Sequence, residues 1–164
     1  MADNIALSTI GVRVGYFKET EAITATSALK EKTFTRLHGL YSTPDFNVAP
    51  NTADVTSFDN ETYTSKIALL REIPDNVEFG ARFGQEFATE WEALCTAYDD
   101  AAAKGTQVWF CITIKGYTKA IYFKGKPLDL GLPAMEANSG IDISVYISPE
   151  SEPVYDEKPT TEIA

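Results

Sequence analysis

The alternation of apolar and polar side chains along short segments is the feature that most constrains the fold, because a period of two residues is typical of a strand with one buried face. Over residues 141–148, Ile and Val alternate with Asp, Ser and Tyr. The same period occurs over residues 10–17, 77–83 and 108–115, and residues 33–41 are rich in Thr and aromatic residues. Gly116-Tyr117-Thr118 fits a hairpin turn that leads into a strand at 119–124. The chain is therefore expected to form about six or more antiparallel strands.

One segment has the helical period instead. Between about residues 86 and 104, the apolar side chains fall on one stripe, namely Phe87, Trp91, Leu94, Cys95 and Tyr98. The opposite face is polar, and Lys104-Gly105 gives a C-terminal stop. The predicted fold class is mainly β: an antiparallel β-sandwich or open barrel with one flanking amphipathic α-helix, formed by residues 1–148 as one domain.

Two segments fit neither period. Residues 42–54 contain Pro44 and Pro50, which predict an extended loop, and Phe46 and Val48 make residues 44–53 a candidate assembly surface. Residues 149–164 carry three prolines and five acidic residues, and are predicted to form an acidic C-terminal arm that a neighbouring subunit holds in place. The apolar stretch 65–73 ends at Pro74, and residues 20–29 are expected to be loop with a possible strand.

The charge is strongly negative, with 14 Lys and Arg against 24 Asp and Glu and a formal net charge of −10. Nucleic-acid affinity depends on cations that neutralise phosphates, so this balance argues against DNA binding. It indicates either ordinary solubility or a surface past which DNA moves without sticking. No apolar run approaches the ~20 residues of a membrane helix. Residues 1–8 lack the features of a signal peptide, so synthesis in the cytoplasm is expected.

Sequence patterns for catalysis, metal or cofactor binding were not found. A serine triad or a Cys–His pair would need His38, and this histidine is interpreted as a packed or partly exposed strand residue. Cys95 and Cys111 are expected to be free structural thiols, and they lack the spacing of a zinc site. Pro127 follows Gly125-Lys126, where a phosphate loop requires Ser or Thr. The chain is therefore not expected to be an enzyme or to bind a cofactor or metal.

The order of several short motifs resembles that of the major tail proteins, or tail tube proteins, of long-tailed phages. The motifs are Tyr41-Ser42-Thr43-Pro44-Asp45-Phe46, Asp54-Val55-Thr56, the apolar turn before Pro74, the 77–83 strand, a helix headed by Phe87 and Trp91, Gly105, and Phe123-Lys124-Gly125. The resemblance covers roughly residues 30–148. Tailocin tubes and the inner tubes of contractile injection systems are similar in fold, and the motif order does not distinguish them from phage tail tubes.

This resemblance implies a structural virion protein that self-assembles into stacked hexameric rings and forms the conduit for DNA ejection. Its implied partners are further copies of itself, the tape measure protein in the lumen, and the tail terminator and tail-tip or baseplate proteins; no membrane is involved. Its implied location is the virion tail, after synthesis in the host cytoplasm. Glu78, Arg82 and Asp142 are candidates for facing the lumen.

A second hypothesis is a β-sandwich binding module of a phage tail that recognises a receptor or a carbohydrate. Its basis is that Trp109 and Tyr146, on the outer faces of strands, would form a stacking platform. The favoured interpretation is that these side chains pack under the helix or at a subunit interface.

Overall fold

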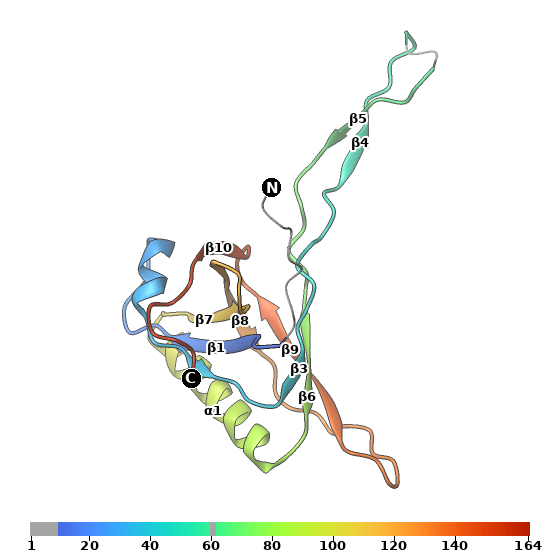
Figure 1. Ribbon diagram of the computed structural model, residues 1–164. Coiled ribbons are helices and arrows are strands. Elements are labelled where there is room, and N and C mark those ends of the chain that lie inside the picture. The colour runs from blue at the N-terminus through green and yellow to red at the C-terminus, as the bar shows by residue number, and fades with distance from the viewer. Residues whose placement is uncertain (1–9, 60–61) are drawn as a thin grey trace.

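The computed structural model describes residues 10–59 and 62–164. These residues form a mainly β fold, a curled antiparallel sheet or half-barrel with one α-helix, which confirms the predicted class (Figure 1). Residues 1–8, in which no signal peptide is expected, lie outside the described residues. The strand order is β2 (Thr35–Arg36), β1 (Arg13–Lys18), β7 (Val108–Thr113), β8 (Lys119–Pro127), β9 (Asp142–Pro149), β6 (Val77–Arg82) and β3 (Leu40–Ser42), with β10 (Val154–Glu157) also paired to β8.

The predicted strand at 33–41 is wrong as a single element, because Gly39 divides it. This glycine has a φ of 77°, a left-handed conformation that other residues adopt only with strain. On one side of it, β2 pairs with β1; on the other, β3 pairs with β6. These strands lie at opposite ends of the sheet order, so residues 37–39 carry the chain from one edge of the sheet to the other. The crossing curls the sheet toward a barrel.

β8 connects the two halves of the sheet. Its first residues pair with β7 on one edge and with β10 on the other, and its last residues, from Gly125 to Pro127, pair with β9. At Gly125 a Cβ would lie 2.5 Å from Cγ2 of Ile147, far inside contact distance. Only glycine therefore allows β8 and β9 to approach this closely at the bend.

α1 (Gln85–Ala103) lies against the inner face of the curled sheet, close to the predicted boundaries. Phe87, Trp91 and Leu94 are buried among the inward side chains of β1, β6, β7, β8 and β9, as the helical stripe predicted. The Trp91 Nε1–H donates a hydrogen bond of 2.8 Å to the Leu128 carbonyl, which fixes the chain just after β8. The helix ends where Gly105 takes a φ of 71°.

The other face of β1, β7 and β8 carries a second, smaller core. Its buried members are Leu29, Phe34, Trp109, Cys111, Ala120, Tyr122 and Ile163. Leu29 comes from the 3-10 helix η1 (Thr26–Glu31), which forms where the sequence predicted loop with a possible strand. Since Ile163 is the second-last residue of the sequence, the C-terminal segment completes this core.

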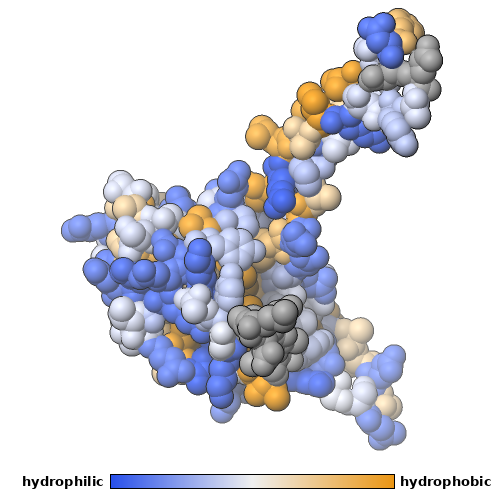
Figure 2. Space-filling model, turned by 45° about the horizontal axis from the view of Figure 1, so that its top comes forward, coloured by the Kyte–Doolittle hydropathy of each residue, from blue (hydrophilic) through white to orange (hydrophobic). Residues whose placement is uncertain are grey.

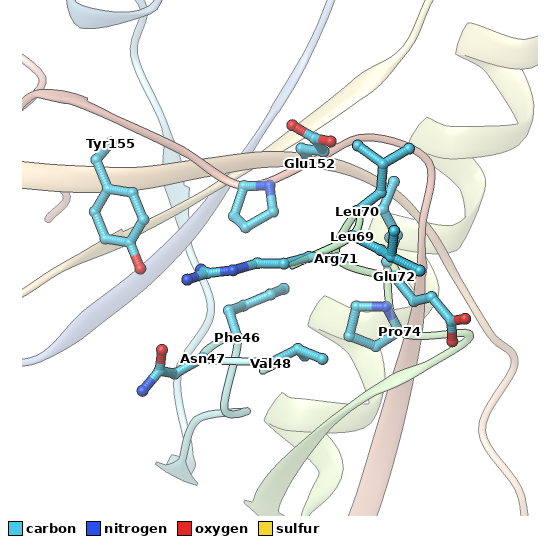
Figure 3. A pocket seen from close by; sticks show the side chains of 12 residues that line it. Phe46, Asn47, Val48, Leu69, Leu70, Arg71, Glu72, Pro74, Glu152 and Tyr155 are labelled. Atoms are coloured by element: carbon cyan, nitrogen blue, oxygen red, sulfur yellow. The ribbon is translucent and has the colours of Figure 1, made fainter. Parts of the chain in front are cut away.

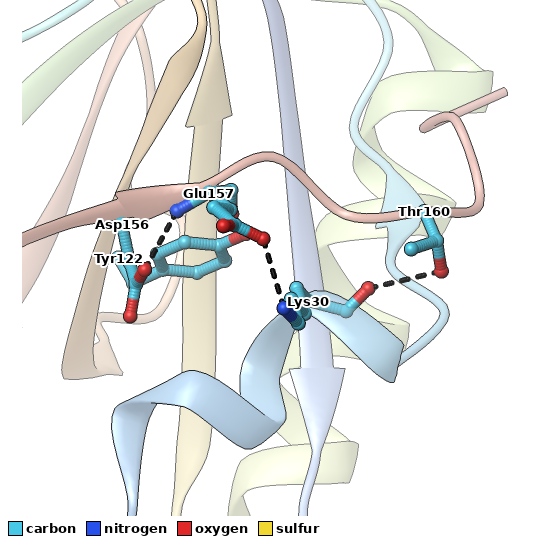
Figure 4. Close-up of polar contacts among 5 residues, drawn as sticks. All are labelled: Lys30, Tyr122, Asp156, Glu157 and Thr160. Atoms are coloured by element: carbon cyan, nitrogen blue, oxygen red, sulfur yellow. Dashed lines mark hydrogen bonds and ion pairs between the residues drawn. The ribbon is translucent and has the colours of Figure 1, made fainter.

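The C-terminal segment is held by its own chain (Figure 4). β10 pairs with β8, and the Tyr122 hydroxyl donates a hydrogen bond of 2.6 Å to the Glu157 carbonyl. The Lys30 ammonium forms an ion pair of 2.8 Å with the Glu157 carboxylate, and the Lys30 carbonyl accepts hydrogen bonds from both the amide and the hydroxyl of Thr160. The expectation that a neighbouring subunit orders residues 149–164 is therefore wrong for these contacts, because a buried apolar anchor and a strand partner lie within the same chain.

β4 (Thr52–Asp54) and β5 (Lys66–Ala68) form a separate two-stranded ribbon that projects far from the body (Figure 1). The sequence predicted an extended loop over 42–54 and an apolar stretch over 65–73, but not that the two segments pair. Residues 43–59 and 62–74 thus form the two sides of one long hairpin, called the arm below.

Replacement of Ile163 by Ala tests whether the C-terminal segment belongs to the folding unit. Ile163 is 1% exposed, and removing a buried Ile side chain typically destabilises a protein by about 2–4 kcal/mol. We expect urea unfolding of I163A to show a loss of that size, whereas T161A, a neighbouring exposed site, changes stability little. A loss in I163A no larger than that in T161A would show that the segment is dispensable for folding.

Candidate assembly interface

The arm is amphipathic across its two faces. Ala53 pairs with Ile67 in the ribbon, and hydrogen bonds from the Val55 amide to the Ser65 carbonyl and from the Leu69 amide to the Asn51 carbonyl extend the ladder. Because side chains two residues apart share a face, Ala53, Val55, Ile67 and Leu69 lie together. The other face presents Thr52, Asp54, Lys66 and Ala68. Figure 2 shows hydrophobic residues gathered along one side of the arm.

No other described part of the chain covers the apolar face of the arm. The exposed fractions of Val55, Ile67 and Leu69 are 49%, 50% and 49%. At the tip, Phe58 and Tyr63 are exposed by 107% and 83%. A two-stranded ribbon alone is marginally stable in water, and contiguous exposed apolar surface usually marks an interaction site. The arm therefore has the composition of a surface that another molecule covers.

The first turn of the tip is held by local polar contacts. Asp54 accepts hydrogen bonds from the amide and the hydroxyl of Thr56, and the Thr56 hydroxyl oxygen accepts one from the Ser65 amide at 2.9 Å. The bonds from Thr56 hold the pKa of the Asp54 carboxyl below its usual value. The tip thus begins from a defined turn rather than from a featureless loop.

A groove opens where the arm joins the body (Figure 3). Its volume is about 350 Å³. Its walls come from residues 46–48 and 69–74 of the arm, from Glu152 and Pro153 at the bend between β9 and β10, and from Tyr155 of β10. Leu70 is 88% exposed and Tyr155 53%. The groove is therefore partly apolar and open to solvent.

The predicted assembly loop, 44–53, contributes to the body as well as to the arm. Phe46 packs against Phe123 with ring centroids 5.0 Å apart, and it borders the main core. Val48 lines the groove. The prediction thus located the start of the arm, while one of its two apolar residues serves to anchor the arm to the sheet.

The predicted aromatic platform is wrong for Trp109. This side chain is 3% exposed, because it lies in the second core beneath η1 and the C-terminal segment. Its Nε1–H donates to the buried carboxylate of Glu19, which also accepts the Gln107 amide at 3.0 Å. Tyr146 is 42% exposed on β9. The interpretation of Trp109 as a packed residue is confirmed, although it packs on the sheet face opposite the helix.

The three candidate lumen residues lie side by side on the outer face of β6 and β9. Arg82 and Asp142 form an ion pair of 2.8 Å, and the Arg82 guanidinium lies 5.2 Å from the centroid of the Tyr41 ring. The Glu78 carboxylate accepts a hydrogen bond from the Ser144 hydroxyl. Sequence reasoning grouped these residues correctly, because all point outward from two paired strands.

His38 and the two cysteines occupy separate places. His38 is exposed; its Nδ1 lies 2.7 Å from Glu90 Oε1, and its amide donates to the other oxygen of Glu90. Cys95 is half-buried beside the main core, and Cys111 is buried in the second core; both are free thiols. Within residues 10–59 and 62–164, no cluster of three or more His, Cys, Asp or Glu side chains is placed to hold a metal ion.

No helix in the described part of the chain is long and apolar enough to span a membrane.

Thiol reactivity tests the interpretation of the cysteines as structural. Burial, with nearby Asp129 and Asp99, raises the pKa of Cys95 to about 11, and burial raises that of Cys111 to about 12. Since the thiolate is the reactive form, both thiols stay protonated until the pH approaches those values. We expect iodoacetamide to alkylate the native protein at pH 8 on the order of 100-fold more slowly than the protein unfolded in urea. Rapid alkylation of either native thiol would contradict this.

Comparison with known proteins identified no family: no family model matches the sequence, and no curated protein matches it. Two matching solved structures are of the phage p2 baseplate in its activated conformation, one with Sr and one with Ca, at TM-scores of 0.45 and 0.44. Identity is 9% in both, and each match covers 87% of this chain and 45% of the other chain. The chain thus spans less than half the length of the proteins it matches, and the proposals below depend on its own residues.

Proposed function

We propose that this chain is a structural virion protein that self-assembles into stacked hexameric rings and forms a phage tail tube, the conduit for DNA ejection. The observation that carries the proposal is the arm, whose apolar face is uncovered while the body from which it projects is internally satisfied. The hexameric ring comes from the resemblance in motif order, not from the geometry of one chain.

The contrast between body and arm supports self-assembly. Among the described residues, no buried side-chain nitrogen or oxygen atom lacks a hydrogen-bond partner, so the body has no polar defect that a ligand would have to fill. The arm has no such closure: Val55, Ile67 and Leu69 are each about half exposed. Burying apolar area contributes roughly 25 cal/mol per Å². Covering this face with another subunit would therefore stabilise both the arm and the contact.

The charge supports a conduit. The net charge is −10, and an acidic lumen would repel DNA phosphates rather than bind them. On the candidate lumen face, Arg82 is paired with Asp142, which leaves the negative charge of Glu78 in excess. We propose the tape measure protein as the occupant of the lumen before ejection, and the tail terminator and tail-tip or baseplate proteins as end partners in the virion. The proposal includes no catalytic activity.

The alternative of a tail binding module for a receptor or a carbohydrate has less support. A stacking platform needs exposed aromatic faces, and Trp109, one of the two aromatic residues named for it, is buried.

Substitution on the apolar face of the arm tests the proposal. We expect I67S/L69S to lose the rings or tubes that wild-type protein forms in negative-stain microscopy, because hydroxyl groups replace apolar area that a neighbour would bury. Its circular dichroism should remain that of the wild type, since both side chains are about half exposed and outside the core.

The matched control is T52S/A68S, which changes the paired residues on the opposite face of the same ribbon. This variant should assemble normally. A wild-type protein that stays monomeric at all concentrations, or equal assembly of both double variants, would contradict assembly through the apolar face.

A further inference from the structure

The groove at the base of the arm combines an apolar wall with one unpaired cation. Phe46, Val48, Leu70 and Pro74 supply apolar surface. Within the described part of the chain, Arg71 has no ion pair or hydrogen bond from its guanidinium. In Figure 3 its side chain extends along the groove toward Tyr155, while the Glu72 carboxylate points to the other side. The Glu72 carboxylate accepts a hydrogen bond of 2.9 Å from the side-chain amide of Asn51. The groove lining has a second acidic residue, Glu152, at its rim, and Arg71 is the basic side chain of the lining, with its guanidinium at the end near Tyr155.

The tip of the arm has the complementary chemistry. Phe58 is 107% exposed, so no described part of this chain covers its ring. The next residue is Asp59, and residues 55–64 contain two acidic residues and no Lys or Arg. The Asp59 amide donates a hydrogen bond to the Ser57 hydroxyl, and the Asp59 carboxylate has no polar partner among residues 10–59 and 62–164. An aromatic ring beside a free carboxylate fits an apolar groove that contains a free guanidinium.

The tip and the groove lie at opposite ends of the same arm, so the tip cannot reach the groove of its own chain (Figure 1). A second copy displaced along the arm can place its tip there. Such a contact joins two different surfaces, the tip of one copy and the groove of the next. Because a free tip and a free groove remain at the two ends of the assembly, further copies can add without forming a closed ring. The volume of about 350 Å³ is at the lower end of the roughly 300–1,000 Å³ of clefts that enclose small ligands, which is enough space for a side chain of this size.

We propose that the tip of one copy's arm docks in the groove of the next copy, with the Phe58 ring against the apolar wall and the Asp59 carboxylate beside Arg71. This inference rests on the proposed self-assembly and specifies the contact between successive copies along the tube axis. The tip is the inserted element, and the arm base together with the β9–β10 bend is its receptor.

Two complementary defects test the contact. F58D places a charge at the tip and leaves the groove unchanged, whereas L70D places a charge in the groove and leaves the tip unchanged. In sedimentation velocity, each variant alone should lose head-to-tail association. Mixed in equal amounts, they should form a complex through the one intact tip and the one intact groove, and growth should stop there because no second functional pair remains.

The controls match the variants in chemistry. L132D makes the same change at a leucine that is 87% exposed, against 88% for Leu70, but lies outside the groove, and S57D places a charge beside Phe58. Both should associate as wild type does. Assembly of L70D equal to that of L132D, or failure of the two defective variants to combine, would overturn the docking while leaving tube formation intact. A wild type that never associates would refute both the docking and the proposed function.

Charge reversal tests the pairing of Asp59 with Arg71. D59K and R71E should each weaken association by about threefold, the size expected for an exposed ion pair. The double variant D59K/R71E should recover most of that loss, because the charges are exchanged between the two surfaces. A double variant weaker than either single variant would show that the two side chains do not meet.

Discussion

The close approach of β8 and β9 at Gly125 is the constraint on which the rest of the body depends. Because Gly125 has no side chain, Ile147 can lie against the β8 backbone, and β8 can leave β10 and continue along β9. This bend joins the two halves of the curled sheet. It places Phe123 in the main core and Tyr122 in the second core, on opposite faces of one strand. α1 and the C-terminal segment each cover one of those faces.

A body built in this way satisfies its own groups, which makes the arm more informative. Residues 37–39 connect the two edge strands, β2 and β3, along the chain. The acidic C-terminal segment completes the second core through β10 and Ile163. Projecting from this body is a ribbon with one apolar face and an aromatic tip. Exposed apolar ribbons are an aggregation hazard in a monomer. Their presence on a well-packed body favours a role in ordered assembly.

The sequence was most informative where burial and periodicity agree. The alternation at 77–83 and 141–148 and the stripe from Phe87 to Tyr98 predicted β6, β9 and α1, because each buries one face against a core. The pairing within the arm was missed because β4 and β5 have three residues each, contain no fully buried residue, and are separated by a long segment whose sequence has no hairpin-turn signal. The tail was misjudged because its prolines and acidic residues predict disorder, whereas its order depends on the distant partners Tyr122 and Lys30. The alternating apolar residues Ala53 and Val55, and Ile67 and Leu69, are the sequence signal for two short strands. The sequence does not show that these two strands pair with each other; the structure does.

Hydrogen–deuterium exchange most directly tests the claim that the body is stably folded in a single copy, whereas the arm becomes stably ordered only when a second copy covers it. Exchange would be measured at low and high protein concentration, across the onset of assembly. We expect the amides of Val55 and Leu69, which bond across the ribbon, to exchange rapidly in dilute protein and to become protected on assembly. Amides of β6 and β9 should be protected in both states. Strong protection of the arm in dilute protein, or no change in the arm on assembly, would contradict the account.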